Sequence, residues 1–263
     1  MTEIPAALVK ELRERTGAGM MECKRALQES GGDIESAHKL LREWGAAQAG
    51  KRAGRETTEG VVLARISDGV GTLVAVGSET EPVSKNDEFQ AFAQRVLDAV
   101  EADGPDAVGN LDDERTDLIA KIGENIVVRG AARFEADGDE LASYVHPPAN
   151  KIGVLVKAEG SPEAARRFAM HVAFAAPRYE SRDQVPSDEI ESEKEIYAKL
   201  PEVESKPEDV RPKIIEGLLN KRFYAENVLA EQAWIHEPKK TVEQALGEEG
   251  LRVIEFQRLA LTE

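Results

Sequence analysis

The stretch LVKELRERTGAGMMECKRAL (8–27) decides the first part of the fold, because it predicts two short helices joined by a glycine-rich turn. Apolar residues recur at helical spacing on both sides of the turn. The segment TGAG (16–19) interrupts this pattern, since glycine readily adopts the positive φ of a helix C-cap. The two apolar faces consist of Ile4, Leu8 and Leu12 before the turn and of Met20, Cys23 and Leu27 after it.

Met21 cannot share the apolar face of Met20, because neighbouring residues on a helix point about 100° apart. One interpretation places both methionines half-buried in a small helical bundle. The other interpretation is a recognition corner on the surface. Its side chains would come from both helices: Lys10, Arg13, Met20, Met21 and Lys24.

Residues 1–45 are predicted to form a compact three-helix unit. Asp33 can cap the third helix, and Gly45 is expected to end it. The small, polar segment 46–58 then predicts a linker. The apolar face of the third helix consists of Ile34, Ala37, Leu41 and Trp44.

The segment GAAQAGK (45–51) has the glycine and lysine spacing of a phosphate-binding loop. However, Arg52 stands where such a loop has the Ser or Thr that contacts Mg²⁺, and a predicted helix precedes the segment in place of a strand. We therefore expect no nucleotide cofactor in this chain.

The composition predicts a cytoplasmic protein of about two domains. The chain has 263 residues and a single cysteine, Cys23, which excludes an internal disulfide and fits a reducing compartment. It has no apolar run long enough to span a membrane and no secretory signal at its start. The net charge of −16 argues against direct binding of nucleic acid, because like charges repel. The scattered histidines are not spaced as in a zinc site.

Beyond residue 58 the sequence predicts an α+β core of two similar units, at 59–138 and at 139–182 with 227–263. In the first unit, strands at 61–66 and 71–78 are joined by a short turn. The segment KIGVLVKAEG (151–160) and the helix after it repeat this plan, which indicates a duplication. The other elements expected are helices at 89–100, 113–122 and 241–246 and strands at 126–134, 141–145 and 251–259.

The first unit has a longer connection between strand and helix than the second, in the segment SETEPVSK (78–85). A loop longer than its scaffold requires is a favourable place for function. The alternative is an ordinary surface excursion.

Residues 183–226 predict a pair of antiparallel helices, a hairpin of the coiled-coil or dimerisation type inserted into the second unit. Pro201 and Pro207 bracket a polar break between the two helices. The apolar stripes consist of Ile190, Ile196, Tyr197 and Leu200 in the first helix and of Val210, Ile214, Ile215, Leu218, Leu219 and Phe223 in the second.

No motif brings together a nucleophile, a base and an orienting group, and most acidic pairs fall on solvated helix faces. We therefore expect no catalytic residues, no metal and no cofactor. The chain fits a binding scaffold better than an enzyme that makes or breaks covalent bonds.

The segments TGAGMMECKRAL (16–27) and GGDIESAHKLLREWG (31–45) resemble the N-terminal module of the bacterial translation elongation factor Ts family. Further segments extend the resemblance over nearly the whole chain. Members of this family are guanine-nucleotide exchange factors for the GTPase elongation factor Tu. The resemblance implies an N-terminal module like the three-helix ubiquitin-associated (UBA) domains, and a heterodimer or heterotetramer with the GTPase.

The segment TEPVSKN (80–86) is similar to the family's T-D-F-V-A-K-N loop, which implies that Thr80, Glu81, Pro82 and Val83 contact the GTPase. In the family, the Asp and Phe of this loop reach the helix that supports the Mg²⁺ and phosphate site. Glu81 keeps the negative charge, whereas Pro82 removes the aromatic wedge and fixes φ. We therefore expect exchange to depend on Glu81 and on contacts elsewhere.

Three further segments match partner-binding positions of the family: AKIGEN (120–125), SYVH (143–146) and WIHEP (234–238), the last being similar to the family's F-V-M-E-P. The contact residues that they imply are Ile122, Gly123, His146, Ile235 and His236. Two alternatives are structural, because Gly123 is also typical of a helix C-cap and an isolated histidine such as His146 often packs or caps locally.

The leading interpretation is an exchange factor that binds elongation factor Tu in its GDP form and promotes GDP release by disturbing the Mg²⁺ and phosphate site. The alternative is an interaction protein that binds the GTPase or a ribosomal partner through its first module and exchanges no nucleotide. Excess GDP or GTP must dissociate the complex of an exchange factor, whereas the complex of the alternative need not respond.

Overall fold

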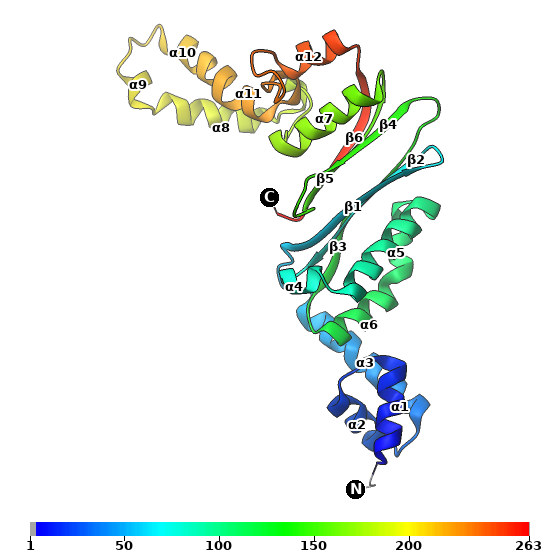
Figure 1. The fold of residues 1–263 in the computed structure, drawn as a ribbon. Helices are drawn as coiled ribbons and strands as arrows, with labels where there is room; N and C mark the ends of the chain where they lie inside the picture. Colours follow the sequence, from blue (N-terminus) through cyan, green and yellow to red (C-terminus); the bar gives the residue numbers. More distant parts are fainter. Residues whose placement is uncertain (1–3, 263) are drawn as a thin grey trace.

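The computed structural model describes residues 4–262, so residues 1–3 and 263, at the outer ends of the predicted first and last units, lie outside the described residues. The fold is α+β, as predicted. Figure 1 shows an elongated arrangement, with three N-terminal helices at one end, two small sheets in the middle and a helical hairpin at the other end.

The N-terminal helices surround a small apolar core, which confirms the predicted three-helix unit. Its elements are α1 (Ala6–Thr16), α2 (Met20–Glu29) and α3 (Ile34–Arg52). Leu12, Cys23 and Leu27 are fully buried in this core. Gly17 ends α1 in the left-handed region, with φ of 68°, and donates its backbone N–H to the carbonyl of Arg13. The Asp33 carboxylate caps α3 by accepting the backbone N–H of Ser36 at 2.8 Å.

The predicted end of the third helix at Gly45 is wrong, because α3 continues to Arg52 through the first part of the segment predicted as a linker. Gly45 instead lies where α3 packs on α6 (Asp112–Ile122). A Cβ at Gly45 would stand 2.9 Å from the Cβ of Ala120. The glycine therefore allows two helices to approach closely and does not terminate one.

The first sheet has the order β1-β2-β3 and is antiparallel throughout. Helices α5 and α6 cover its outer face (Figure 1), where Phe89, Phe92 and Val96 of α5 fill the core against Val74 and Val76 of β2. The elements of this unit are β1 (Glu59–Ser67), β2 (Val70–Ser78), α4 (Glu81–Ser84), α5 (Asp87–Asp103), the 3₁₀ helix η1 (Pro105–Leu111), α6 and β3 (Ile126–Glu135).

The second sheet repeats this plan with the antiparallel order β4-β5-β6, which agrees with the predicted duplication. Its elements are β4 (Glu140–Val145), β5 (Ile152–Glu159), α7 (Pro162–Ala175), α12 (Val242–Glu249) and β6 (Arg252–Ala260). The inner faces of the two sheets pack on one another through Leu73 and Leu155. Small residues make this possible, since a Cβ on Gly153 would lie 2.6 Å from Cγ1 of Val62.

The hairpin between α7 and α12 projects from the second unit, as predicted (Figure 1). Its elements are η2 (Arg182–Gln184), α8 (Ser187–Ala198), α9 (Pro201–Glu204), α10 (Arg211–Leu218), the π-helical turn η3 (Leu219–Tyr224), α11 (Ala225–Asn227) and η4 (Leu229–Glu231). The prediction that Ile196 and Val210 belong to the apolar stripes is wrong, because Ile196 is 51% exposed and Val210 is 39% exposed. Val203 of α9, which lies in the predicted polar break, is fully buried.

Candidate functional site

The connection between β2 and α5 (residues 79–86) is tied at its base to the segment that follows α6. Thr80 donates its backbone N–H to Oε2 of Glu124 at 3.0 Å and its hydroxyl to Oε1 of the same carboxylate at 2.7 Å. Asn125 donates its backbone N–H to Oε1 of Glu79 at 2.6 Å and its side-chain amide to the carbonyl of Arg55 at 3.0 Å. These bonds fix the connection against the first sheet.

The tip of the β2–α5 connection presents an acidic side chain and a proline to solvent. Glu81 and Pro82 are exposed in the first turn of α4. Lys85 lies one turn later and donates to the Glu81 carboxylate at 2.6 Å. This hydrogen bond and the charge of Lys85 lower the pKa of Glu81, so the tip carries a carboxylate at neutral pH. Val83 points inward and packs against the core of the first unit.

The end of α6 lies beside this connection, so the structure brings together two of the segments implied by the resemblance. Ile122 is half-buried against the same core as Val83. Gly123 caps α6 with φ of 86° and donates its backbone N–H to the carbonyl of Ile119 at 2.9 Å. Gly123 therefore forms the helix C-cap that the sequence analysis gave as its structural alternative. The next residue, Glu124, accepts the hydrogen bond from the Thr80 hydroxyl, and the sequence motifs did not predict this interaction.

The prediction that both methionines are half-buried is wrong, and so is the assignment of Met20 to the buried face. Met20 is 57% exposed and Met21 is 73% exposed, because they occupy the first turn of α2, outside the small core formed by Cys23 and Leu27. The cationic side chains predicted beside them, Lys10 and Arg13 of α1 and Lys24 of α2, are also exposed. Lys24 follows Met20 by one turn of α2, and an exposed pair of large apolar side chains beside a cation is a favourable contact surface, which we call the methionine surface (Met20, Met21 and Lys24).

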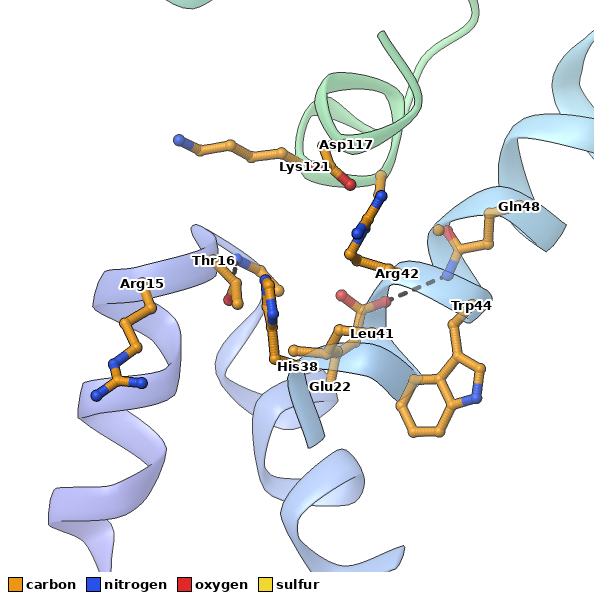
Figure 2. Close-up of a pocket in the computed structure, with 13 residues that line it drawn as sticks. Arg15, Thr16, Glu22, His38, Leu41, Arg42, Trp44, Gln48, Asp117 and Lys121 are labelled. Atoms are coloured by element: carbon orange, nitrogen blue, oxygen red, sulfur yellow. Dashed lines mark hydrogen bonds between the residues drawn. The ribbon is translucent and has the colours of Figure 1, made fainter. Parts of the chain in front are cut away.

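The first three helices dock on α6 around a cavity of about 110 Å³ (Figure 2). Asp117 and Lys121 of α6 line one side of it, and Thr16, His38 and Trp44 line the other. The Lys121 side chain also covers the turn after α1, since a Cβ on Gly17 would stand 2.5 Å from its Cε. Helix α6 thus contacts the turn between α1 and α2, and the residue Glu124 that follows α6 holds the β2–α5 connection.

A second candidate surface lies on the other sheet. His146 at the end of β4 and Ile235 line one open depression of about 670 Å³, although they are far apart in the sequence. His236 is not among its lining residues: its side chain is exposed, and its Nε2 donates to the carbonyl of Arg167 at 3.1 Å. We call this surface the distal depression. Its lining includes Tyr144, His146, Met170, Phe174, Ile235 and Pro238.

The sequence analysis missed Phe174, which is 80% exposed at the distal depression. A signal was present in the spacing, because Phe174 falls six positions after Phe168 and so about 240° away from the buried face of α7. An aromatic residue off the apolar face of a helix has no core to fill. Phe174 is therefore the largest exposed apolar side chain of the second unit among residues 4–262.

The described residues contain no group of three or more His, Cys, Asp or Glu side chains placed to hold a metal ion. Nor does any helix within residues 4–262 have the length and apolar character needed to cross a membrane. The candidate surfaces described above are exposed patches of mixed apolar and charged side chains.

Known proteins match this chain over nearly its whole length. A family model described as Elongation factor TS matches residues 79–263, beginning at the first residue of the β2–α5 connection. Elongation factor Ts of Vibrio campbellii is 44% identical over 266 residues, which cover 100% of this chain and 93% of that protein. Elongation factor Ts of Shewanella loihica is 44% identical over 264 residues, with 99% and 92% covered.

A third relative, elongation factor Ts of Colwellia psychrerythraea, is 43% identical over 263 residues, covering 99% of this chain and 92% of that protein. Together with the α+β fold, these matches define a translation elongation factor. The chain belongs to the elongation factor Ts family.

Proposed function

We propose that this protein binds elongation factor Tu in its GDP form and accelerates GDP release, so that GTP can replace GDP. The observation that carries the proposal is the fixed base of the β2–α5 connection, where Thr80 makes two hydrogen bonds to Glu124 while Glu81 and Pro82 stay exposed. A tip held in one place loses little conformational entropy when it binds a partner.

Glu81 supplies the charge in this mechanism. Its pKa is lowered by the hydrogen bond from Lys85, so it remains a carboxylate at neutral pH. A carboxylate brought beside a bound Mg²⁺ and phosphate repels the phosphate and competes for the cation. Because Mg²⁺ and the surrounding dipoles account for much of the nucleotide affinity, their displacement loosens GDP. The protein acts through binding energy and without covalent catalysis.

The interface energy needed to weaken GDP binding is larger than the tip of the β2–α5 connection can supply. A thousandfold loss of GDP affinity corresponds to about 4 kcal/mol of interface energy. A specific interface buries roughly 800 Å² on each partner, which two tip residues cannot provide. We therefore include in the interface the methionine surface of α2 and the distal depression around Phe174. By linkage, GDP must weaken the complex by the same factor by which this protein weakens GDP binding.

The test is stopped-flow release of a fluorescent GDP from the cognate elongation factor Tu, with and without this protein. We expect the parent protein to accelerate release in a concentration-dependent way, and Glu81→Ala to reduce that acceleration by about tenfold, which is about 1.4 kcal/mol. Pro82→Phe tests the aromatic wedge separately. An unchanged rate in Pro82→Phe would show that the wedge is dispensable in this protein.

Glu202→Ala is the matched control for Glu81→Ala. Glu202 also lies in the first turn of a four-residue helix beside a proline, is exposed, and pairs with Arg222 at 3.0 Å. Its loss removes the same charge at the hairpin, far along the chain from the candidate surfaces. We expect Glu202→Ala to exchange like the parent protein.

A binding measurement separates exchange from mere association. The proposal requires that excess GDP dissociate the complex of this protein with elongation factor Tu. A complex that forms, resists excess GDP and leaves GDP release unaccelerated would overturn the proposal in favour of a non-exchanging interaction protein.

A further inference from the structure

His171 is a buried histidine of α7 whose two ring nitrogens both have polar partners. Its side chain is fully buried, with Nε2 3.0 Å from Oε1 of Gln232. The backbone N–H of Ile235 donates to its Nδ1, with an N···N distance of 3.4 Å. One imidazole thus connects α7 to the segment that carries Ile235 and His236.

The partners of Gln232 determine which nitrogen of His171 carries the proton. The amide group of Gln232 donates to the carbonyls of Ala175 at 3.1 Å and Glu226 at 2.8 Å, so its Oε1 faces the ring as an acceptor. Nε2 of His171 must then carry the hydrogen, which leaves a lone pair on Nδ1 for the N–H of Ile235. The network therefore requires a neutral ring in one tautomer.

This ring contacts one residue that lines the distal depression, Ile235, and follows another, Met170, on α7. It stacks on Trp234, with ring centroids 5.0 Å apart, and Trp234 in turn contacts the ring of His236 at 4.9 Å. Ala173 and Phe174 follow His171 on α7 and line the same depression as Ile235. The bond to the Ile235 N–H hence fixes one wall of the depression relative to the other.

We infer that His171 is a positioning residue for the distal contact with the partner GTPase: its neutral imidazole holds Ile235 against Phe174 in the geometry that the partner recognises. This inference rests on the function proposed above. A proton on Nδ1 would place an N–H group against the N–H of Ile235 and abolish that bond.

The surroundings of His171 favour the neutral form. Burial lowers its pKa, the hydrogen bond to Gln232 acts in the opposite sense, and the charge of His236 lowers the pKa further. The other charged side chains around this ring stack are Arg167, which lies over Trp234, and Glu249, which pairs with Arg167 at 2.9 Å. The contact is therefore intact at neutral pH and is lost as the ring becomes protonated in acid.

Two substitutions of similar polarity test the role of Nδ1. In His171→Asn the side-chain oxygen can occupy the place of Nδ1 and accept the N–H of Ile235, whereas His171→Gln places its amide near Nε2 and leaves that N–H without its acceptor. We expect the affinity for elongation factor Tu near pH 7.5 to stay within about twofold of the parent in His171→Asn and to fall by about fivefold in His171→Gln. Equal losses of affinity in both variants would overturn the inference, because a purely structural role would affect them alike.

The pH dependence gives a second readout. The GTPase and every other residue of this protein are common to the measurements on the parent and on His171→Asn, so the ratio of the two affinities isolates His171. We expect the parent to lose more affinity than His171→Asn between about pH 7.5 and the lowest pH at which both proteins stay folded, because burial lowers the pKa of His171. A constant ratio contradicts the inference.

The free parent protein provides a readout that needs no variant. In amide NMR spectra, the Ile235 N–H resonance should shift with the same midpoint as the ring protons of His171. Titration of the His171 ring without a shift of Ile235 would overturn the inference. Failure of the parent protein to accelerate GDP release would instead overturn the proposed function, so the two outcomes are distinct.

Discussion

Thr80 and Glu124 are joined by two hydrogen bonds, from the backbone N–H at 3.0 Å and from the hydroxyl at 2.7 Å, across 44 positions of sequence. One carboxylate therefore holds the base of the β2–α5 connection next to the end of α6. The two segments that the family resemblance implicates in partner binding form one surface for this reason.

Removal of the Thr80 hydroxyl should slow GDP release clearly while changing the free energy of unfolding only slightly. Thr80→Val keeps the branched shape but loses the hydrogen bond from the hydroxyl to Glu124. Because this hydrogen bond is solvent-exposed, it contributes about 1 kcal/mol or less to folding. We expect stopped-flow measurements to show an acceleration of GDP release that is roughly threefold to tenfold smaller, because the tip is more mobile without this bond. Thr80→Ser retains the hydroxyl and should behave like the parent protein, and equal rates in all three proteins would contradict the prediction.

The crossing of α3 and α6 can be tested with the same substitution at two glycines of one helix. Gly50→Ala meets no atom within 4 Å and should stabilise the protein by about 0.5–1 kcal/mol through helix propensity. Gly45→Ala places a Cβ 2.9 Å from that of Ala120 and should destabilise it by about 1 kcal/mol or more. Urea unfolding measures both changes.

A compensating substitution distinguishes this clash from other causes. Ala120→Gly, combined with Gly45→Ala, removes the opposing methyl group and should recover part of the lost stability. Additive losses in the double variant would show that the two helices are not in contact at this point.

Cys23 should react slowly with thiol reagents in the native state. Its side chain is fully buried, and burial raises the pKa of the thiol, so little thiolate is exposed to a reagent. We expect a disulfide reagent at about pH 8 to modify Cys23 at the rate at which the first three helices open. Modification as fast in buffer as in concentrated urea would contradict the burial of Cys23.

Phe174 should contribute to binding and not to folding. Phe174→Ala removes a ring that is 80% exposed, so the free energy of unfolding should change by no more than about 0.5 kcal/mol. Affinity for elongation factor Tu should fall by about tenfold if the ring is buried in the complex. Ile254→Ala is the control, because Ile254 of β6 is 41% exposed and does not line the distal depression.

Acid should destabilise the folded protein through His171. Because burial lowers the pKa of His171 in the folded state below its ordinary value of 6.5, the unfolded chain binds the proton more readily. The free energy of unfolding should therefore be unaffected by this group above about pH 6.5 and should fall as the pH drops below it. Urea midpoints of the parent and His171→Asn at about pH 8 and pH 5.5 check this, since the drop should be smaller in the variant.

Local patterns were sufficient for most of the secondary structure. The helical spacing around the glycine turn predicted α1 and α2, and Asp33 marked the start of α3 by capping chemistry that acts over one turn. Alternating apolar runs predicted β1 and β2, and their echo predicted the second sheet. These signals are read correctly because propensity, capping and burial of one face act between residues close in sequence.

Local patterns failed wherever a distant segment decided the outcome. Gly45 resembles a helix end, yet α3 continues through it to Arg52, and the missing Cβ leaves room for Ala120 of α6. Met20 has the spacing of a core residue, yet it is exposed because the small core ends at Cys23. Neither result has a signature in the residues next to the position concerned.

The sequence by itself thus determined the α+β class, the duplicated plan of the two sheets, the helical hairpin and the segments that match the elongation factor Ts family. Only the tertiary structure decided how those segments combine: Thr80 with Glu124, His146 with Ile235 and Phe174, and His171 with Gln232 across 61 positions. The physical reason is that hydrogen bonds and packing between remote positions depend on where the chain returns in space, which residue spacing does not encode.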